Sequence, residues 1–179
     1  RQLIDTNLIG SISVIQAALP HLRRQGGGHV VQVSSEGGQI AYPGFSLYHA
    51  SKWGIEGYVE AVRQEVAGFG IQFTLAEPGP ARTNFGAALE RTALPPDYAN
   101  TPVDALLRAL DDGSWVITGD PQRMVDAMIA CTEQTPPPLR LVMGTAAYHA
   151  IHAALSTRLA ALEAQRAIAF STDAPATAH

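Results

Sequence analysis

The single lysine of the chain gives the first indication of chemistry. Of the 12 basic residues, 11 are arginine and one is Lys52. Because lysine and arginine differ in shape, hydration and pKa behaviour, a lone lysine indicates a site that requires an ammonium. The alternative is that the lysine has no function and reflects drift in a sequence of biased composition. Tyr48 stands four residues before Lys52, which places a phenol and an ammonium on one face of a helix.

Polar side chains also follow the ends of two predicted strands. A short β-branched run ends at Ser35, and Thr83 follows the next strand behind a Pro78-Gly79 turn. Ligands in open parallel sheets bind beyond the carboxyl ends of the strands, so both hydroxyls can reach the same crevice. Ser34 is a rival to Ser35, and each of these residues taken alone also fits an ordinary strand end, cap or turn.

The elements that would position these side chains alternate between helix and strand. Such alternation is typical of an α/β fold with a doubly wound parallel sheet. We expect a cap at Ser46, a long irregular loop over 81–101 with a helical turn at 86–92, and either an edge strand or a lid around Trp115. Hydrophobic spacing and Gly or Pro punctuation predict helices over 1–25, 46–67, 102–111, 120–133 and 145–168, and strands over 29–35, 71–76 and 139–144.

Three strands make a thin sheet, since five or six are typical. Because the sequence also begins inside a predicted helix, we expect residues 1–170 to form the later part of one larger doubly wound domain. Residues 171–179 are expected to be a disordered tail.

Composition excludes several classes of function. Hydrophobic residues make up 46% and charged residues 16%, which is typical of a globular core. The net charge of −4 argues against nucleic-acid binding. The single Cys131 rules out an intrachain disulfide and favours a reducing, cytoplasmic compartment. No apolar run reaches the roughly 18 residues of a membrane span, so no membrane partner is expected. His149 and His152 lack a third ligand nearby, so no metal site is predicted.

Taken in order, these residues resemble the short-chain dehydrogenase/reductase family. The serine 13 residues before the tyrosine, Ser35, is the one that the family spacing favours. The resemblance implies a Rossmann-type domain that transfers a hydride between NAD or NADP and a carbonyl or alcohol substrate. It also implies a homodimer or homotetramer formed through the helices over 1–25 and 46–67. The segments that carry it are N-L-I-G at 7–10, Y-H-A-S-K at 48–52 and E-P-G-P-A-R-T at 77–83, with weaker likeness in G-D-P at 119–121 and P-P-L-R-L at 137–141.

The same resemblance implies a role for each matching residue. Tyr48 would be the general acid in reduction and the base in oxidation. Because a free tyrosine titrates at about pH 10, the Lys52 cation would assist it and would also bond the cofactor ribose. Ser35 would hydrogen-bond the substrate oxygen. Asn7 would hold a water in a proton relay to Lys52. The nicotinamide end would be contacted by Pro78, Gly79 and Thr83.

The loop after the second strand predicts the character of the substrate. A mostly small and apolar stretch over 86–94 would form a lid suited to an apolar molecule. Tyr42, Phe45, Phe85 and Ser35 would line the substrate pocket beneath it.

Part of the family pattern has no counterpart in the sequence. The Gly-rich turn that seats the pyrophosphate at a helix N-terminus is missing, and so is the residue that separates NAD from NADP. Gly26, Gly27 and Gly28 precede a strand instead of opening a helix. The alternative function is therefore a non-catalytic regulator or binding protein on the same fold, and a third is an epimerase or dehydratase that uses the same tyrosine and lysine.

Overall fold

The computed structural model describes residues 1–86, 89 and 91–174. Ala87, Ala88 and Glu90 of the predicted lid, and residues 175–179 of the predicted tail, lie outside the described residues. The described elements, in chain order, are α1 (Gln2–Ile4), η1 (Asp5–Gly10), α2 (Ser11–Arg24), β1 (Gly28–Val33), η2 (Glu36–Gly38), α3 (Ser46–Glu65), η3 (Ala67–Phe69), β2 (Ile71–Pro78), η5 (Pro96–Tyr98), α4 (Pro102–Asp111), α5 (Pro121–Thr132), β3 (Arg140–Met143), α6 (Thr145–Ala164) and α7 (Arg166–Ser171).

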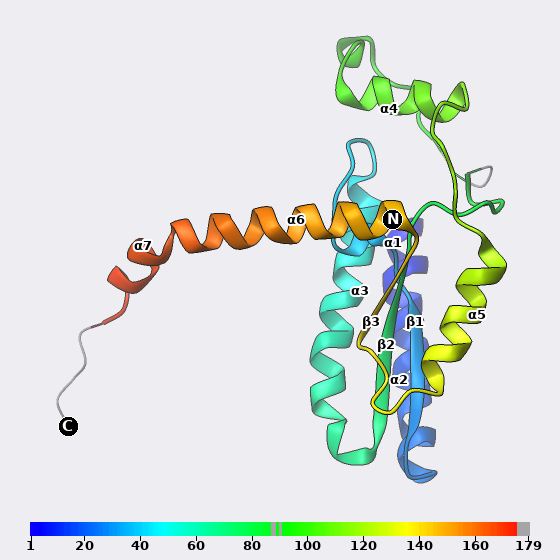
Figure 1. Cartoon of the computed structure of the whole chain (residues 1–179), viewed down its shortest axis with the longest axis vertical. Coiled ribbons are helices and arrows are strands. Elements are labelled where there is room, and N and C mark those ends of the chain that lie inside the picture. The colour runs from blue at the N-terminus through cyan, green and yellow to red at the C-terminus, as the bar shows by residue number, and fades with distance from the viewer. Residues whose placement is uncertain (87–88, 90, 175–179) are drawn as a thin grey trace.

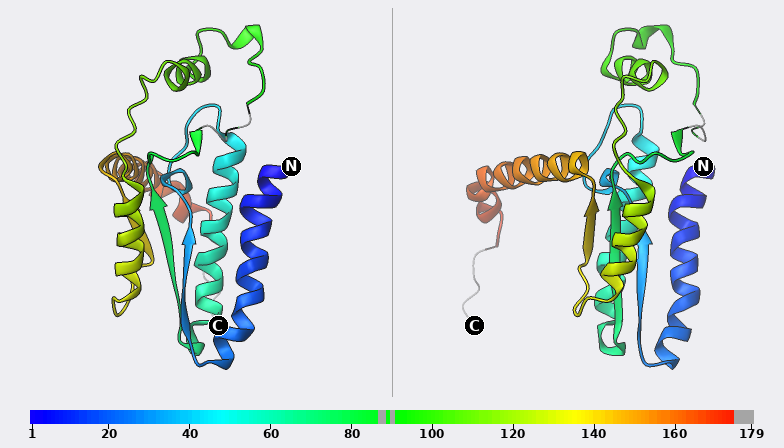
Figure 2. Two further views of the ribbon diagram at one scale, coloured as in Figure 1. Left: turned by 90° about the vertical axis from the view of Figure 1, so that its right-hand side faces the viewer. Right: turned by 45° about the vertical axis from the view of Figure 1, so that its right-hand side comes forward.

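The strands form a parallel sheet in the order β1-β2-β3, which confirms the predicted α/β architecture (Figure 1). The register of the first pair runs from Gly28 opposite Ile71 to Val33 opposite Ala76. Helices α2 and α3 cover one face of the sheet and α5 covers the other (Figure 2). The carboxyl ends of β1 and β2 therefore lie side by side, next to the start of α3.

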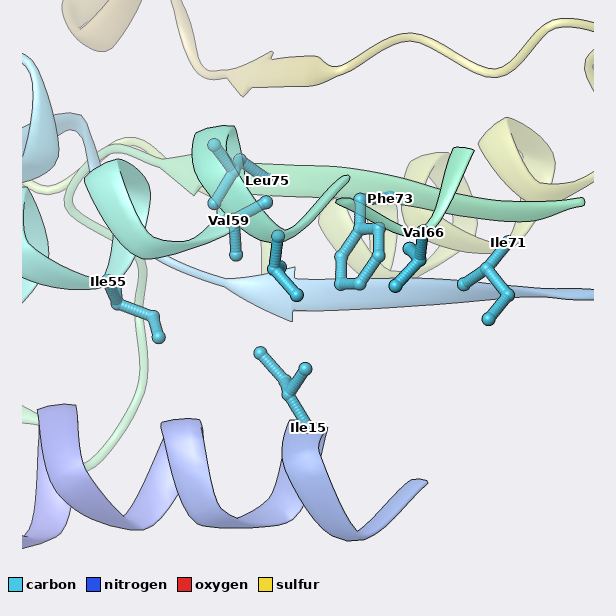
Figure 3. Close-up of a cluster of buried hydrophobic side chains, with 8 residues drawn as sticks. Ile15, Ile55, Val59, Val66, Ile71, Phe73 and Leu75 are labelled. Atoms are coloured by element: carbon cyan, nitrogen blue, oxygen red, sulfur yellow. The ribbon is translucent and has the colours of Figure 1, made fainter. Parts of the chain in front are cut away.

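The main core lies between β2 and the two helices on its face (Figure 3). The predicted apolar stripe of α3 is buried here: Ile55 and Val59 are fully enclosed, and Ile15 reaches them from α2. Burial of each such side chain stabilises the fold by about 1.5–3 kcal/mol relative to exposure. This packing fixes the rotation of α3 and so fixes which of its residues point toward the strand ends.

Local capping differs in part from the sequence prediction. Ser46 does not cap α3, because Phe45 occupies the N-cap position and makes no side-chain cap hydrogen bond. Asp120 does cap α5, accepting from the backbone N–H groups of Gln122 at 2.9 Å and Arg123 at 3.3 Å. Trp115 lies in no strand; its backbone N–H donates to the carbonyl of Ala109 at 3.0 Å.

One described helical run, Gln2–Arg24, is long and apolar enough to cross a membrane when judged by length and composition alone. The expectation that no segment reaches this threshold is therefore wrong, because no Asp, Glu, Lys or Arg lies between Asp5 and Arg23. A helix that packs on a core passes the same test, and Leu8, Ile12, Ile15, Leu19 and Leu22 of this run pack against the main core.

Helix α6 leaves the sheet at the end of β3 and projects away from it (Figure 1). Ala147 and Ile151 are its buried residues. Farther along, the guanidinium of Arg158 lies 5.0 Å from the ring centroid of Trp53 on α3, a cation–π contact between the two helices. Helix α7 ends at Ser171, the first residue of the predicted tail.

Candidate active site

Tyr48 and Lys52 share one face of α3, as their spacing predicts. The Lys52 Nζ lies 5.8 Å from the centroid of the Tyr48 ring. The same ammonium donates to the carbonyl of Val33, at the end of β1, over 3.3 Å. Burial lowers the pKa of Lys52, and the nearby negative charge of Glu56 opposes that shift. The ammonium is therefore held at the strand end in a state that releases its proton more readily than a free lysine.

The surroundings of Tyr48 keep its phenol protonated. Burial raises the pKa of Tyr48, a hydrogen bond with Ser35 lowers it, and the negative charge of Glu36 raises it. The net direction is upward from 10.0, so the charge of Lys52 does not offset burial in this arrangement. A protonated phenol at neutral pH is the form required of a general acid.

The two candidate serines point to different places. The Ser35 Oγ accepts from the backbone N–H of Gly37 at 3.0 Å, and the Ser35 hydroxyl lowers the pKa of the Tyr48 phenol. Ser34 is only 2% exposed, and its Oγ donates instead to Glu56 Oε1 at 2.7 Å. Ser35 is therefore the hydroxyl at the Tyr48 site, and Ser34 belongs to a buried cluster behind it.

Asn7 faces α3 from a π-helical turn. Its Nδ2 donates to the Ser51 Oγ at 3.5 Å, and that hydroxyl donates to the carbonyl of Tyr48 at 2.7 Å. The wider turn over Asp5–Gly10 is an irregularity of the kind that often marks functional sites in helices. Asn7 thus lies against the segment of α3 that carries both Tyr48 and Lys52.

The end of β2 carries the predicted cofactor contacts. The N–H of Gly79 donates to the carbonyl of Met143 at 2.9 Å. A Cβ at Gly79 would lie 3.0 Å from the Ala147 Cβ and 3.4 Å from Glu36 Oε2, so a side chain there would crowd both neighbours. Thr83 is exposed, and its Oγ1 accepts from the backbone N–H of Phe85 at 3.2 Å. No described hydrogen bond joins Thr83 to Ser35, Tyr48 or Lys52.

Two of the three predicted aromatic pocket residues contact Tyr48. Phe45 and Phe85 pack edge-to-face on its ring, with centroids 6.3 and 5.9 Å away. Tyr42 lies one layer behind, with its ring 5.4 Å from that of His49 and 6.0 Å from that of Trp115. The phenol is therefore flanked by apolar rings.

Sequence reasoning missed two residues beside this site. Glu36 follows Ser35 directly and is only 3% exposed; its carboxylate accepts from the Tyr42 hydroxyl. Burial raises the pKa of Glu36. His49 follows Tyr48 and is 5% exposed. Their positions next to the two candidate catalytic residues are the only sequence signal that could have identified them.

A partly buried ionic cluster lies behind the site and was also missed. Arg140 of β3 contacts three carboxylates: Glu56 at 3.2 Å, Glu60 at 2.6 Å and Glu77 at 3.0 Å. Gln39 donates to both Glu56 and Glu77. The cluster ties α3 to the end of β2 and the start of β3, one turn beyond Lys52.

Metal-ligand geometry is not found at this site. Within the part of the chain that the structure describes, no group of three or more His, Cys, Asp or Glu side chains could hold a metal ion. His149 and His152 both lie beside the Tyr148 ring on α6, with centroids 5.6 and 6.1 Å from it.

Known proteins are similar to this chain in sequence and in fold. Residues 1–93 match the family model described as short chain dehydrogenase. The chain is 37% identical over 142 residues to "Oxidoreductase BOA17" of Botryotinia fuckeliana, covering 79% of this chain and 52% of the relative. It is 30% identical over 147 residues to human "Retinol dehydrogenase 8", covering 78% and 47%. The chain therefore spans about half the length of these curated relatives.

Solved structures agree with the sequence matches. A short-chain dehydrogenase from Streptomyces avermitilis superposes with a TM-score of 0.83 at 33% identity, covering 97% of this chain and 62% of that one. A short chain dehydrogenase from Burkholderia cenocepacia, solved in complex with NADP, superposes with a TM-score of 0.64 at 23% identity, covering 90% and 56%. The second likeness establishes the fold alone.

Proposed function

This chain belongs to the short-chain dehydrogenase family, and from that membership we propose that it contributes the acid–base site of an NAD- or NADP-dependent oxidoreductase that interconverts a carbonyl and an alcohol. The observation that carries the proposal is the Lys52 ammonium 5.8 Å from the centroid of the Tyr48 ring. The Ser35 hydroxyl, which lowers the pKa of the same phenol, supports it. Support from similar proteins is that the Botryotinia relative is named an oxidoreductase and that the Burkholderia dehydrogenase was solved with NADP.

We infer that residues at the ends of β1 and β2 would hold the nicotinamide end of a dinucleotide. Gly79 packs closely at the end of β2, where a side chain would crowd Ala147 and Glu36. Lys52 presents a donor at the end of β1, within 3.3 Å of a backbone carbonyl. Lys52 would hold the ribose hydroxyls, and Pro78, Gly79 and Thr83 would border the nicotinamide. A bound NADH or NADPH supplies the hydride that reduces the substrate carbon.

The side chains supply the proton. Ser35 donates to the carbonyl oxygen and polarises the C=O bond. As negative charge develops on that oxygen, Tyr48 transfers its phenolic proton and forms the O–H bond of the alcohol. Lys52 then stabilises the phenolate and passes a proton back to it, and its lowered pKa favours that release. Asn7 would hold the water that reloads Lys52 from solvent. In alcohol oxidation every proton moves in the opposite direction.

We propose an apolar carbonyl or alcohol as the substrate, because Phe45 and Phe85 flank the phenol. A cytoplasmic location and a homodimer or homotetramer remain proposals from the sequence. A substrate panel in which small charged keto acids outcompete apolar ketones would contradict the substrate class.

Cofactor binding tests the proposal directly. The melting temperature of the chain is measured with NADH and, separately, with NADPH. A ligand at about 100 times its Kd stabilises the folded state by about 2.7 kcal/mol, which raises the melting temperature measurably. A shift with either cofactor supports the proposal and identifies the dinucleotide. An unchanged melt with both would favour the alternative, a binding protein or fragment without a competent cofactor site.

A further inference from the structure

The side chain of His49 is buried beside Tyr48, and both of its ring nitrogens have backbone partners. The Nε2 lies 2.8 Å from the backbone nitrogen of Tyr42, and the Nδ1 lies 2.8 Å from the carbonyl oxygen of Gly37. A peptide N–H can only donate and a carbonyl can only accept. Nε2 must therefore be the bare acceptor and Nδ1 must carry the proton. These two partners fix His49 as the neutral Nδ1–H tautomer.

The hydrogen bonds of His49 continue to the candidate catalytic serine. Gly37, whose carbonyl accepts from His49, donates its own N–H to the Ser35 Oγ at 3.0 Å. In that bond the Ser35 Oγ is the acceptor, so its own proton remains available to another group, and the Ser35 hydroxyl lowers the pKa of Tyr48. The orientation of the Ser35 hydroxyl thus depends on where the Gly37 peptide is held.

A second connection closes the ring. Tyr42, whose N–H donates to His49, donates its hydroxyl to the carboxylate of Glu36, the residue between Ser35 and Gly37. The rings of His49 and Tyr48 also pack closely on Gly37, because a Cβ there would lie 3.1 Å from each ring. The loop over 36–42 is therefore held at both ends by one imidazole.

Resting on the proposed function, we propose that His49 is a positioning residue: as the Nδ1–H tautomer it holds the Gly37 peptide so that the Ser35 hydroxyl faces Tyr48 and the substrate oxygen. His49 itself does not touch the reacting atoms, since both of its nitrogens are used within the protein. A merely structural role would affect stability without affecting the Ser35–Tyr48 contact.

The tautomer can be measured without substrate or cofactor. Two-bond ¹⁵N–¹H NMR spectra distinguish the Nδ1–H from the Nε2–H form of each of the six histidines. The His49 signals are assigned by their loss in His49→Asn. The proposal expects the Nδ1–H form at neutral pH. An Nε2–H or a rapidly exchanging ring at this residue would overturn it.

The positioning role is tested with two variants. In His49→Asn the side-chain amide nitrogen takes the place of Nδ1 and can still donate to Gly37. In His49→Phe the ring size is kept and both hydrogen bonds are lost. Because the Ser35 hydroxyl lowers the pKa of Tyr48, His49→Phe is expected to raise that pKa further, while His49→Asn stays closer to the native protein. The titration is followed through the ¹³Cζ signal of Tyr48.

Turnover gives the second readout. For His49→Phe we expect kcat to fall by about 10²-fold, the low end of the range for a lost proton-transfer or oxyanion contact, with cofactor Kd unchanged and partial recovery in His49→Asn. Equal Tyr48 pKa values in the native protein and both variants would overturn the positioning role. If the native protein itself shows no turnover, the proposed function fails, while the NMR readouts still decide the role of His49.

Discussion

Replacing Glu77 by glutamine is expected to stabilise the fold at neutral and alkaline pH. Glu77 is 0% exposed at the end of β2. Burial and the negative charge of Glu56 raise its pKa to about 7, against the opposing effects of Arg140 and Gln39. The native state therefore holds a proton on this carboxyl that the unfolded chain, with a pKa of 4.5, has already released.

The sign of the pH dependence follows from that difference. Between pH 4.5 and about 7 the folded state binds more protons than the unfolded state. The unfolding free energy therefore decreases as pH rises through this window, and the contribution of Glu77 is fully favourable only below pH 4.5. At about 1.4 kcal/mol per pKa unit, the decrease amounts to about 3 kcal/mol.

Glutamine reproduces the uncharged carboxyl and has no proton to lose. Urea unfolding of Glu77→Gln and the native protein is compared near pH 4.5, the unfolded-state pKa, and at about pH 8, above the whole window. We expect similar stability at the lower pH and a gain of about 1–3 kcal/mol for the variant at the higher pH.

Glu60→Gln is the matched control, because Glu60 contacts the same arginine but Arg140 lowers its pKa. The stability contributed by Glu60 is present above the unfolded-state pKa of 4.5 and is lost as pH falls, so this variant is expected to lose stability at the higher pH. If Glu77→Gln were destabilised equally at both pH values, Glu77 would be a charged partner of Arg140 throughout, and the reasoning would be refuted.

Three further outcomes are expected. Because Lys52 is the only lysine, ¹⁵N-lysine NMR gives one side-chain signal; its pKa should lie below 10.5 and fall further in Glu56→Gln, and a value at or above 10.5 would contradict burial of the ammonium. Gly38→Ala should cost about 1–3 kcal/mol in urea unfolding, since a Cβ there would overlap Glu56 Oε1, whereas Gly57→Ala, with nothing within 4 Å, should not destabilise. Leu75→Ala should cost about 2–5 kcal/mol in the same assay, because Leu75 is 0% exposed in the main core, and a loss under about 1 kcal/mol would contradict that packing.

Local patterns explain what could be predicted from the sequence. The spacing of Ile55, Val59 and Val62 predicts α3 and its buried face, because helix periodicity is a property of neighbouring residues. The same spacing places Tyr48 and Lys52 on one face. The interval of 13 residues between Ser35 and Tyr48 matches a family pattern, and this interval alone favours Ser35 over Ser34 as the serine of the site.

Contacts between distant residues explain what could not be predicted. Arg140 meets Glu56 across 84 positions of sequence, and no local pattern relates the two. The positions of Glu36 and His49 beside the site depend on how the loop over 36–42 folds back on α3, which neither residue type specifies. Ser46 is not the N-cap of α3, because Phe45 takes that position. The backbone geometry sets where a helix begins, and a sequence pattern locates that residue only to within one or two positions.

Reduction of a carbonyl by Tyr48→Phe, compared with Tyr58→Phe, tests the central claim most directly. Both substitutions remove one hydroxyl from α3, and Tyr58 packs against the core away from Ser35. With the cofactor that raises the melting temperature, we expect Tyr48→Phe to lose about 10²–10⁴-fold in kcat and Tyr58→Phe to retain native turnover. Native turnover in Tyr48→Phe, with the cofactor bound as in the native protein, would show that this phenol is not the acid.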